Sequence, residues 1–229
     1  TIEVNVSVSG AGADIKYFMV GLPDNSIRES WHRIESAVKE NHFNMPRTKI
    51  VVNLSPADVR KEGTHYDLPI AIGVLGSSLQ MPSHHFHEYV ILGELSLDGS
   101  IKPIKGALPI AIQARKEGFK GIILPKQNAR EAAIVSDIKV YGVENIHEVV
   151  RFLSDDLDLE ETVVNTREEF FNQVGFNDID FSDVKGQENI KRALEIAAAG
   201  GHNAILIGPP GAGKTMLAKR LPGILPPLS

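Results

Sequence analysis

Residues 208–215 read GPPGAGKT, which fits the pattern G-x-x-x-x-G-K-[ST] of a phosphate-binding loop. Residues 203–207 (NAILI) before it have strand character, and residues 216–221 (MLAKRL) after it can continue as a helix. A strand, a glycine-rich loop and a helix in this order turn backbone N–H groups and the positive end of a helix toward one anion. The alternative is a glycine-rich turn that binds nothing, but the complete match in this context favours a nucleotide site.

This loop predicts ATP and Mg²⁺ as cofactors. Lys214 would reach the β- and γ-phosphates and Thr215 would bind Mg²⁺, so these two are the predicted catalytic residues and Thr215 is the predicted metal ligand. Glycines in the loop allow the tight turn that the phosphate cradle needs. The predicted nucleotide-binding residues of the loop are Gly208, Pro209, Pro210, Gly211, Ala212, Gly213, Lys214, Thr215 and Met216.

The composition is that of an ordinary globular protein, with 229 residues of which 42% are apolar and 23% charged. No apolar run approaches the roughly 20 residues that span a bilayer, so no membrane partner is expected. The absence of cysteine and of a visible leader suits a cytoplasmic protein. Residues 1–153 carry 17 basic and 17 acidic side chains and residues 154–229 carry 7 and 12, so neither part has the basic excess of a stand-alone nucleic-acid-binding domain.

The first two-thirds of the chain mixes strand and helix patterns. Asp24 as N-cap and Asn41 as C-terminal stop bound a helix over 24–40, and its Trp31 is assigned to the core rather than to a ligand platform. The Asp-Gly turn at 97–100 joins two strands, 89–95 and 100–104, in a hairpin. Further strands are expected over 1–8, 17–20, 49–54, 121–124 and 138–143, and further helices over 68–79, 106–117, 129–135 and 145–153. The mixed order predicts an α+β fold rather than a doubly wound sheet.

The acidic stretch 154–161 (SDDLDLEE) predicts a domain boundary. We expect a first domain over 1–153, an acidic linker over 154–180 that is weakly helical around 168–173, and a second domain over 181–229. Within the second domain, residues 187–199 form a strong helix pattern that leads to the phosphate-binding loop.

Residues 181–187 (FSDVKGQ), some twenty residues before the phosphate-binding loop, resemble the start of AAA+ ATPase modules. The resemblance implies that Val184, Lys185 and Gly186 flank the nucleotide base. In such modules an acidic Walker B strand, sensor residues, an arginine finger and a helical lid follow the loop, but only 14 residues follow Thr215 here. We therefore expect the truncated N-terminal part of an AAA+ module, from a parent ATPase, and no ATP hydrolysis by the 229-residue chain itself.

The first domain carries several distinctive stretches that together resemble one family, the magnesium-chelatase-like AAA+ ATPases called YifB or ComM. They are 20–24 (VGLPD), 52–58 (VNLSPAD), 61–63 (KEG), 67–71 (DLPIA), 92–99 (LGELSLDG) and 121–125 (GIILP). This resemblance covers nearly the whole chain. It implies an N-terminal domain similar to the proteolytic domain of Lon peptidases, on the ribosomal S5 domain 2-like fold, with a short N-terminal stretch trimmed.

Lon-type peptidases use a Ser–Lys dyad, and the dyad positions are testable here. Matching 61–67 to the serine region puts His65 or Tyr66 at the serine position, and matching 99–104 to the lysine region puts Leu108 at the lysine position. Both catalytic residues are therefore expected to be lost. A substitute pair, Thr64 with Lys105, is conceivable, but an inactive Lon-like scaffold is the better interpretation.

Other polar clusters favour structural roles. His84, His85 and His87 suggest a metal site, but neighbouring histidines in a strand point to opposite faces and no carboxylate pair lies at ligand spacing, so a surface loop is favoured. Arg60, Lys61 and His65 are interpreted as residues of a solvated loop rather than as contacts to phosphate or to an acidic partner. Asp58, Glu62 and Asp67 are interpreted as turn and cap residues.

Three classes of function remain. The family resemblance implies an ATP-driven DNA motor, a ring (hexamer) in the full-length protein associated with branch migration during natural transformation. A protein-remodelling or metal-chelatase-type ATPase is the second class, and the Lon-like domain argues against a chelatase. An ATP-dependent Lon-like peptidase is the third, which the missing dyad disfavours.

Overall fold

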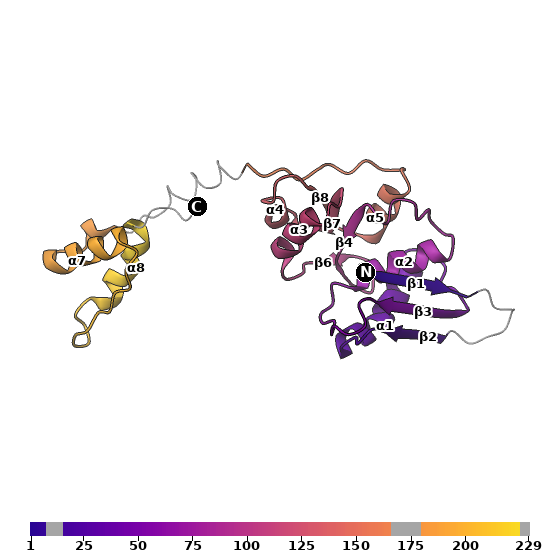
Figure 1. Ribbon diagram of the computed structural model, residues 1–229, viewed down its shortest axis with the longest axis horizontal. Helices are drawn as coiled ribbons and strands as arrows, with labels where there is room; N and C mark the ends of the chain where they lie inside the picture. Colours follow the sequence, from indigo (N-terminus) through magenta and orange to yellow (C-terminus); the bar gives the residue numbers. More distant parts are fainter. Residues whose placement is uncertain (8–15, 166–179, 225–229) are drawn as a thin grey trace. The chain divides into compact units, whose positions relative to one another are not determined.

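The computed structural model describes residues 1–7, 16–165 and 180–224 (Figure 1). By internal contacts the chain divides into two compact units, residues 1–164 and residues 165–229. The expected domain limits at 153 and 181 remain predictions. The two units are described separately.

The N-terminal part of the first unit is a mixed sheet in the order β1–β3–β2. β1 (Ile2–Val6) runs antiparallel and β2 (Lys16–Val20) parallel to the central strand β3 (Lys49–Leu54). Residues along β3 alternate between buried and less buried, as their period-two pattern predicts. The central strand therefore turns one face toward a core and the other toward a more open environment.

Two helices supply the other side of that core. α1 (Asn25–Glu40) begins and ends where its caps predict, since the Asp24 side chain accepts from the Ile27 N–H and Asn41 is the C-cap. α2 (Asp67–Ser77) packs against α1 and β1. Trp31 of α1 is 2% exposed and its ring stacks on Tyr17 at 4.5 Å, so its predicted place in the core is confirmed.

The remainder of the first unit is built on a parallel sheet in the order β4–β7–β8. Its strands are β4 (Tyr89–Ile91), β7 (Gly121–Pro125) and β8 (Lys139–Val143). Every residue of β7 is buried, as expected of a central parallel strand with both faces covered.

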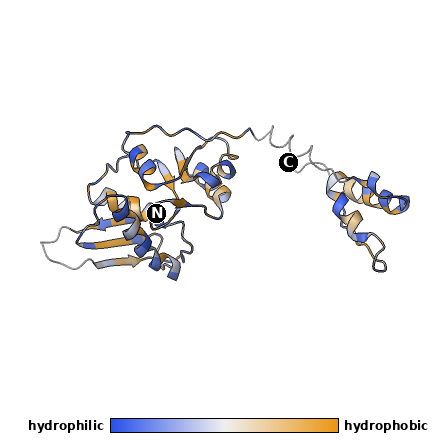
Figure 2. Cartoon of the chain, turned by 180° about the vertical axis from the view of Figure 1, so that it is seen from behind, coloured by the Kyte–Doolittle hydropathy of each residue, from blue (hydrophilic) through white to orange (hydrophobic). Residues whose placement is uncertain are grey.

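Helices cover both faces of this parallel sheet (Figure 1). Ile122 and Leu124 of β7 pack in one cluster with α3 (Ala107–Lys116) and α4 (Lys126–Ala132). Ile123, which points the other way, joins the larger cluster that contains α5 (Ile146–Leu153) and the cores of α1, α2 and β3. Figure 2 shows both hydrophobic and hydrophilic residues on these helices, as helices that cover a core on one side require.

The strand predicted over 89–95 is wrong as a single strand. β4 ends at Ile91, and β5 (Glu94–Leu95) pairs instead with β6 (Ile101–Lys102) in a separate antiparallel hairpin. Gly93 lies at the crossover, where an added Cβ would come within 2.8 Å of the Ile101 side chain, so the close approach needs a glycine. The predicted turn at 97–100 is confirmed.

After α5 the chain continues to pack against the first unit. The Thr162 N–H donates to the Val140 carbonyl at 2.8 Å, Glu161 forms a β-bridge with Tyr141, and Leu159 packs against the larger cluster. The acidic stretch 154–161 is thus held beside β8. The weak helix expected around 168–173 lies outside the described residues.

The described part of the second unit consists of three short elements. They are the 3₁₀ turn η1 (Phe181–Asp183), α7 (Glu188–Ala199) and α8 (Lys214–Ile224). Four buried residues, Phe181, Val184, Leu194 and Leu217, make up their apolar cluster. The predicted helix before the phosphate-binding loop is confirmed in α7.

Residues 203–207 do not form the predicted strand. They are largely exposed, with Ile205 84% and Ile207 88% accessible. A strand exists only through hydrogen bonds to a neighbour, and residues 180–224 contain no second strand with which this segment could pair.

Candidate nucleotide-binding site

The loop 208–215 has the backbone conformation that its glycines predict. Gly211 and Gly213 adopt φ values of +81° and +79°, a region that L side chains rarely enter. α8 begins at Lys214, so the loop runs directly into a helix N-terminus. The free N–H groups of that first turn and the helix dipole favour an anion at this end.

Lys214 lies over its own loop. Its ammonium donates to the carbonyls of Gly208 and Pro209, both at 2.7 Å. Thr215 and Met216 follow in the exposed first turn of α8. A flexible ammonium held only by two carbonyls of an exposed loop can exchange these partners for phosphate oxygens.

The segment predicted to flank the base lies against the same loop. Gln187, directly after Gly186, donates from its side-chain amide to the Ala212 carbonyl at 3.3 Å. Lys185 and Gly186 are exposed, whereas the Val184 side chain is buried in the apolar cluster of this unit. The structure therefore brings two motifs 25 residues apart into contact, with the valine packed inward.

Arg220 of α8 fastens the start of this unit to the helix. Its guanidinium donates to the Asp180 carbonyl at 2.9 Å and to the Asp183 carboxylate at 3.2 Å. Sequence reasoning missed this contact, although a basic residue at position 220, shortly after the loop, and acidic residues at 180 and 183 before it were visible. Arg220 positions the segment before Val184 relative to α8.

These residues fit a nucleoside triphosphate with its metal. The cradle is a loop whose glycines leave open space, since an added Cβ at Gly211 would meet no atom within 4 Å. Lys214 supplies the mobile cation and Thr215 a hydroxyl of the kind that binds Mg²⁺. Mg²⁺ would neutralise phosphate charge when bound, and the loop and helix end would orient the phosphates.

The residues expected at the Lon dyad positions lie in separate parts of the first unit. His65 and Tyr66 precede α2, with their rings 4.2 Å apart, and burial lowers the pKa of His65 and raises that of Tyr66. Leu108 lies half-buried in α3. The Thr64 hydroxyl donates to the Glu94 carboxylate, and Lys105 is exposed, with no hydrogen bond between the two among the described residues.

Asp67 is the most deeply buried carboxylate near this region, and its role is structural. Arg33 of α1 grips it with two hydrogen bonds of 2.7 and 3.0 Å, and the Leu95 N–H donates to it at 3.3 Å. Burial raises the pKa of Asp67, and the bonds from Arg33 oppose that rise. The Asp67 carboxylate therefore joins α1, α2 and β5. Its expected role as a cap residue is wrong, because Tyr66 is the N-cap of α2 and no side chain caps that helix.

The family-like stretches 20–24 and 61–63 lie side by side. Asp24 donates its N–H to the Lys61 carbonyl at 3.0 Å and accepts from the Gly63 N–H at 3.3 Å. Lys61 is buried, with its ammonium on the carbonyls of Pro56 and Val59, so it is not the solvated loop residue that was expected.

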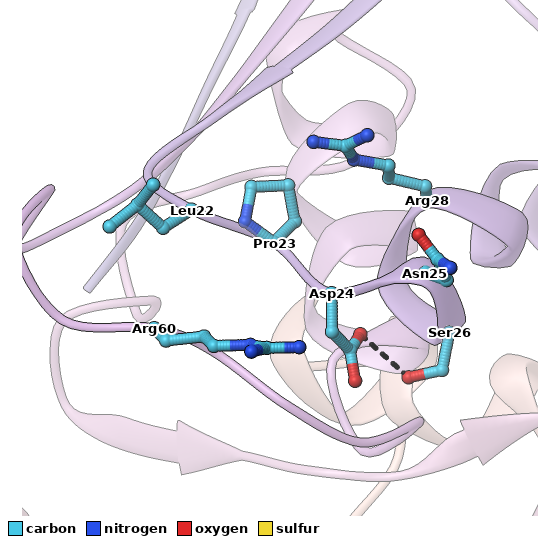
Figure 3. A pocket seen from close by; sticks show the side chains of 7 residues that line it. All are labelled: Leu22, Pro23, Asp24, Asn25, Ser26, Arg28 and Arg60. Carbon is cyan, nitrogen blue, oxygen red and sulfur yellow. Dashed lines mark hydrogen bonds between the residues drawn. The ribbon is translucent and has the colours of Figure 1, made fainter.

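A shallow cavity of about 540 Å³ lies at this junction (Figure 3). The cavity is lined by Leu22, Asp24, Arg28 and Arg60. Of the two neighbouring cations Arg60 and Lys61, only Arg60 is exposed. Asp24 is occupied as a helix cap and accepts from Ser26 at 2.7 Å. The cavity is an open surface feature rather than an enclosed site.

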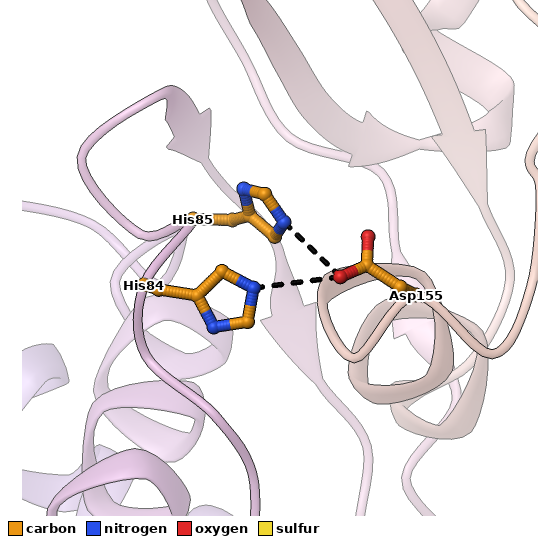
Figure 4. Close-up of side chains that lie close together, drawn as sticks. All are labelled: His84, His85 and Asp155. Carbon is orange, nitrogen blue, oxygen red and sulfur yellow. Dashed lines mark hydrogen bonds and ion pairs between the residues drawn. The ribbon is translucent and has the colours of Figure 1, made fainter.

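The interpretation of His84 and His85 as histidines that point apart is wrong. They lie in a turn before β4 rather than in a strand, and both Nε2 atoms face the Asp155 carboxylate, at 3.4 and 3.2 Å (Figure 4). Turn geometry removes the alternation on which the expectation relied. His87 stays outside this group of ligand atoms.

Fold and site together define a class: a mixed α/β unit followed by a phosphate-binding loop at a helix N-terminus. Two family models match in that order. Residues 2–128 match the model described as subunit ChlI of Mg-chelatase, and residues 180–229 match the model described as magnesium chelatase, subunit ChlI. The chain belongs to the magnesium-chelatase-like YifB/ComM family, which confirms the resemblance in its sequence.

Curated relatives agree over the whole chain. Competence protein ComM of Haemophilus influenzae and the uncharacterized protein YifB of Salmonella typhimurium are each 42% identical over 229 residues, all of this chain and 44% and 43% of theirs. The archaeal Lon protease of Thermococcus kodakarensis is 25% identical over 160 residues, 68% of this chain and 25% of that protein. The chain thus spans less than half the length of ComM and YifB. Within its described parts, no helix has the length and apolar character to cross a membrane.

Proposed function

We propose that this chain contains the nucleotide-binding loop of an ATP-driven DNA motor. In the full-length protein the motor works as a hexameric ring. The observation that carries the proposal is the loop 208–215, which has positive φ at Gly211 and Gly213 and runs into α8 at Lys214. A cytoplasmic location follows from this proposal, because ATP and DNA are found together there.

In this proposal each loop residue has a defined task. Lys214 exchanges the carbonyls of Gly208 and Pro209 for β- and γ-phosphate oxygens, and Thr215 holds Mg²⁺. The remaining loop N–H groups and the first turn of α8 bind the other phosphate oxygens. Lys185 and Gly186, exposed beside the loop, flank the base together with the backbone at Val184.

The exposed segment 203–207 supports a longer catalytic module. Ile205 and Ile207 present apolar side chains that a parallel sheet would bury. We propose that this segment becomes a strand when sequence following residue 229 in a longer protein supplies its neighbours. The 44% coverage of ComM by this chain supports that reading.

The first unit is proposed to be a non-proteolytic scaffold on the S5 domain 2-like fold. The 25% identity to an archaeal Lon protease supports its ancestry, while the residues at the dyad positions are His65 or Tyr66 and Leu108. The Thr64 hydroxyl is bonded to a carboxylate instead of a lysine amine. Labelling of Thr64 by a hydroxyl-directed inhibitor, or peptide cleavage lost in Lys105→Ala, would contradict this assignment.

The decisive experiment measures ATPase rate of the full-length protein with and without four-way-junction or forked DNA. A motor predicts stimulation by the junction, loss of all activity in Lys214→Ala, and retained activity in the control Lys219→Ala, which changes another lysine of the same helix. An ATPase rate that does not change with DNA but rises with a protein partner or a metal-insertion substrate would favour a remodelling or chelatase-type ATPase. The chelatase names of both family models point to that class.

A second measurement separates binding from hydrolysis. Such ATPases complete the Mg²⁺ site with a carboxylate on a neighbouring strand, and residues 180–224, as the structure describes them, contain no strand. The purified chain is therefore expected to turn over no ATP. Measurable turnover that disappears in Lys214→Ala would show that the chain is an enzyme by itself.

A further inference from the structure

Three side chains from two distant segments meet at the surface of the first unit. The Asp155 Oδ2 atom lies 3.4 Å from the His84 Nε2 atom and 3.2 Å from the His85 Nε2 atom. One ligand atom from each of the three residues falls within 4.8 Å of the others. Figure 4 shows both imidazole rings turned toward the same carboxylate oxygen.

The two nitrogen–oxygen separations match the edges of a metal coordination tetrahedron. Zinc–nitrogen and zinc–oxygen bonds of about 2.0–2.15 Å place neighbouring tetrahedral ligands about 3.3–3.5 Å apart. The two nitrogen–oxygen distances therefore accept an ion between the atoms with little movement of the backbone. Two imidazoles and a carboxylate are also a ligand set that zinc prefers.

The ring of His85 is oriented by a second carboxylate. Its Nδ1 atom lies 3.0 Å from Glu88 Oε1, and the other Glu88 oxygen accepts from Lys120 at 2.8 Å. Metal-binding histidines are commonly held this way, because an acceptor on one ring nitrogen fixes the proton there and leaves the lone pair of the other for the ion. His85 is the least exposed of the three side chains, at 24%.

Backbone hydrogen bonds at the C-terminal end of α5 hold Asp155 in a conformation that aspartate does not favour. Its N–H donates to the Phe152 carbonyl at 3.2 Å and the Asp156 N–H donates to the Arg151 carbonyl at 2.9 Å, the two bonds of a Schellman motif. The left-handed position of this motif usually holds glycine, yet Asp155 occupies it with φ of +60°. A carboxylate thus stands where the backbone favours a residue without a side chain.

We propose that His84, His85 and Asp155 form a binding site for a divalent transition-metal ion of the zinc class. His84 and His85 bind through Nε2 and Asp155 through a carboxylate oxygen, and a water molecule completes the tetrahedron on the exposed side. The ion would link residues 71 positions apart in the sequence. It would thereby fix the segment after α5 to the turn before β4.

The test titrates the metal-free 229-residue chain with Zn²⁺ against a chromogenic chelator. We expect one ion per chain with an affinity in the micromolar range or tighter. Co²⁺ in place of Zn²⁺ is expected to give the strong visible absorption of a tetrahedral site. A weak, unsaturating titration, or a Co²⁺ spectrum typical of octahedral hydration, would overturn the proposal.

Matched variants locate the ion. Asp155→Asn keeps a residue that tolerates the left-handed conformation, and together with the double variant His84→Gln/His85→Gln it is expected to weaken Zn²⁺ binding at least tenfold. Glu88→Ala, which removes the acceptor on Nδ1 together with the ion pair to Lys120, is expected to weaken it by about 10-fold. His87→Gln, an exposed histidine outside the cluster, should leave the affinity unchanged.

Circular dichroism of each variant separates lost binding from lost folding. If Asp155→Asn stays folded and binds Zn²⁺ as tightly as the unchanged chain, the three residues form a hydrogen-bonded cluster only and the proposal is wrong. Equal losses in His87→Gln and in the double variant would likewise assign the binding to scattered surface histidines.

Discussion

The two units differ in how extensively they are packed and in the chemical motifs that they contain. Residues 1–164 contain two apolar clusters, a parallel sheet covered on both faces and a buried ion pair. The described part of the second unit, 180–224, contains five buried apolar residues, four of them in one cluster, and leaves Ile205 and Ile207 exposed. Yet the strongest chemical motif of the chain, 208–215, lies in the sparsely packed unit.

This contrast shows that a phosphate-binding loop and its fold have different requirements. The loop needs glycines at left-handed positions and a helix that starts at Lys214, and both are local properties that are present here. The strand before it needs neighbours, which are long-range partners. A recognisable motif is therefore compatible with an incompletely packed surrounding.

Separating the units should have the largest effect. A chain of residues 1–164 is expected to unfold cooperatively on heating, because it holds both large clusters. A chain of residues 165–229 is expected to show no cooperative transition, since a few buried residues do not offset the conformational entropy. Calorimetry of both pieces checks this, and a sharp transition in 165–229 would contradict the proposed dependence on missing strands.

Removing the buried ion pair should destabilise the first unit strongly. Arg33→Ala leaves the fully buried Asp67 carboxylate without its bidentate partner and is expected to lower the free energy of unfolding by about 3–5 kcal/mol. Lys39→Ala, which removes an exposed pair with Glu35 on the same helix, should cost under about 0.5 kcal/mol. Urea unfolding of 1–164 measures both, and equal losses would show that the buried pair has no special weight.

One pair of identical substitutions compares the units directly. Ile123→Ala removes a side chain with no exposed surface and is expected to cost about 2–5 kcal/mol, because it loses apolar burial and leaves a cavity. Ile205→Ala removes an 84% exposed side chain and is expected to change stability by less than about 0.5 kcal/mol. Chemical denaturation of the whole chain measures both. In a longer protein that completes the sheet, the cost at Ile205 should rise toward that at Ile123.

Local signals allowed most of the first unit to be predicted. The cap at Asp24, the stop at Asn41 and the alternation over 49–54 act within a few residues, and the helix and strand they bound are confirmed. The strand over 89–95 was wrong because residues 94–95 pair with β6 instead of continuing in the parallel sheet. The sequence of a segment can indicate its caps, but it does not identify the strand with which the segment pairs.

The same distinction explains which candidate site residues the sequence could indicate. Lys214 and Thr215 could be proposed from the sequence, because the loop motif fixes residue types at fixed spacing, and their roles stay predictions. The meeting of His84 and His85 with Asp155 was not, because it spans about 70 residues and depends on a turn before β4 and a Schellman motif after α5. The local hint was an aspartate at position 155, just beyond Ser154 and the predicted helix end at 153.

Asp155 also gives the smallest expected effect, and one whose sign depends on the metal. Without metal, Asp155→Gly should stabilise the first unit by about 0.5–1 kcal/mol, because glycine adopts the left-handed position more easily than aspartate and the exposed contacts to His84 and His85 contribute little. With excess Zn²⁺ the order should reverse, since only the unchanged chain gains the free energy of binding the ion in its folded state. Thermal unfolding of both chains with a chelator and then with Zn²⁺ measures the two differences. A glycine variant that stays more stable under both conditions would mean that Asp155 holds no ion. The reversal would show that the strained backbone at Asp155 is offset by the free energy of binding the metal ion.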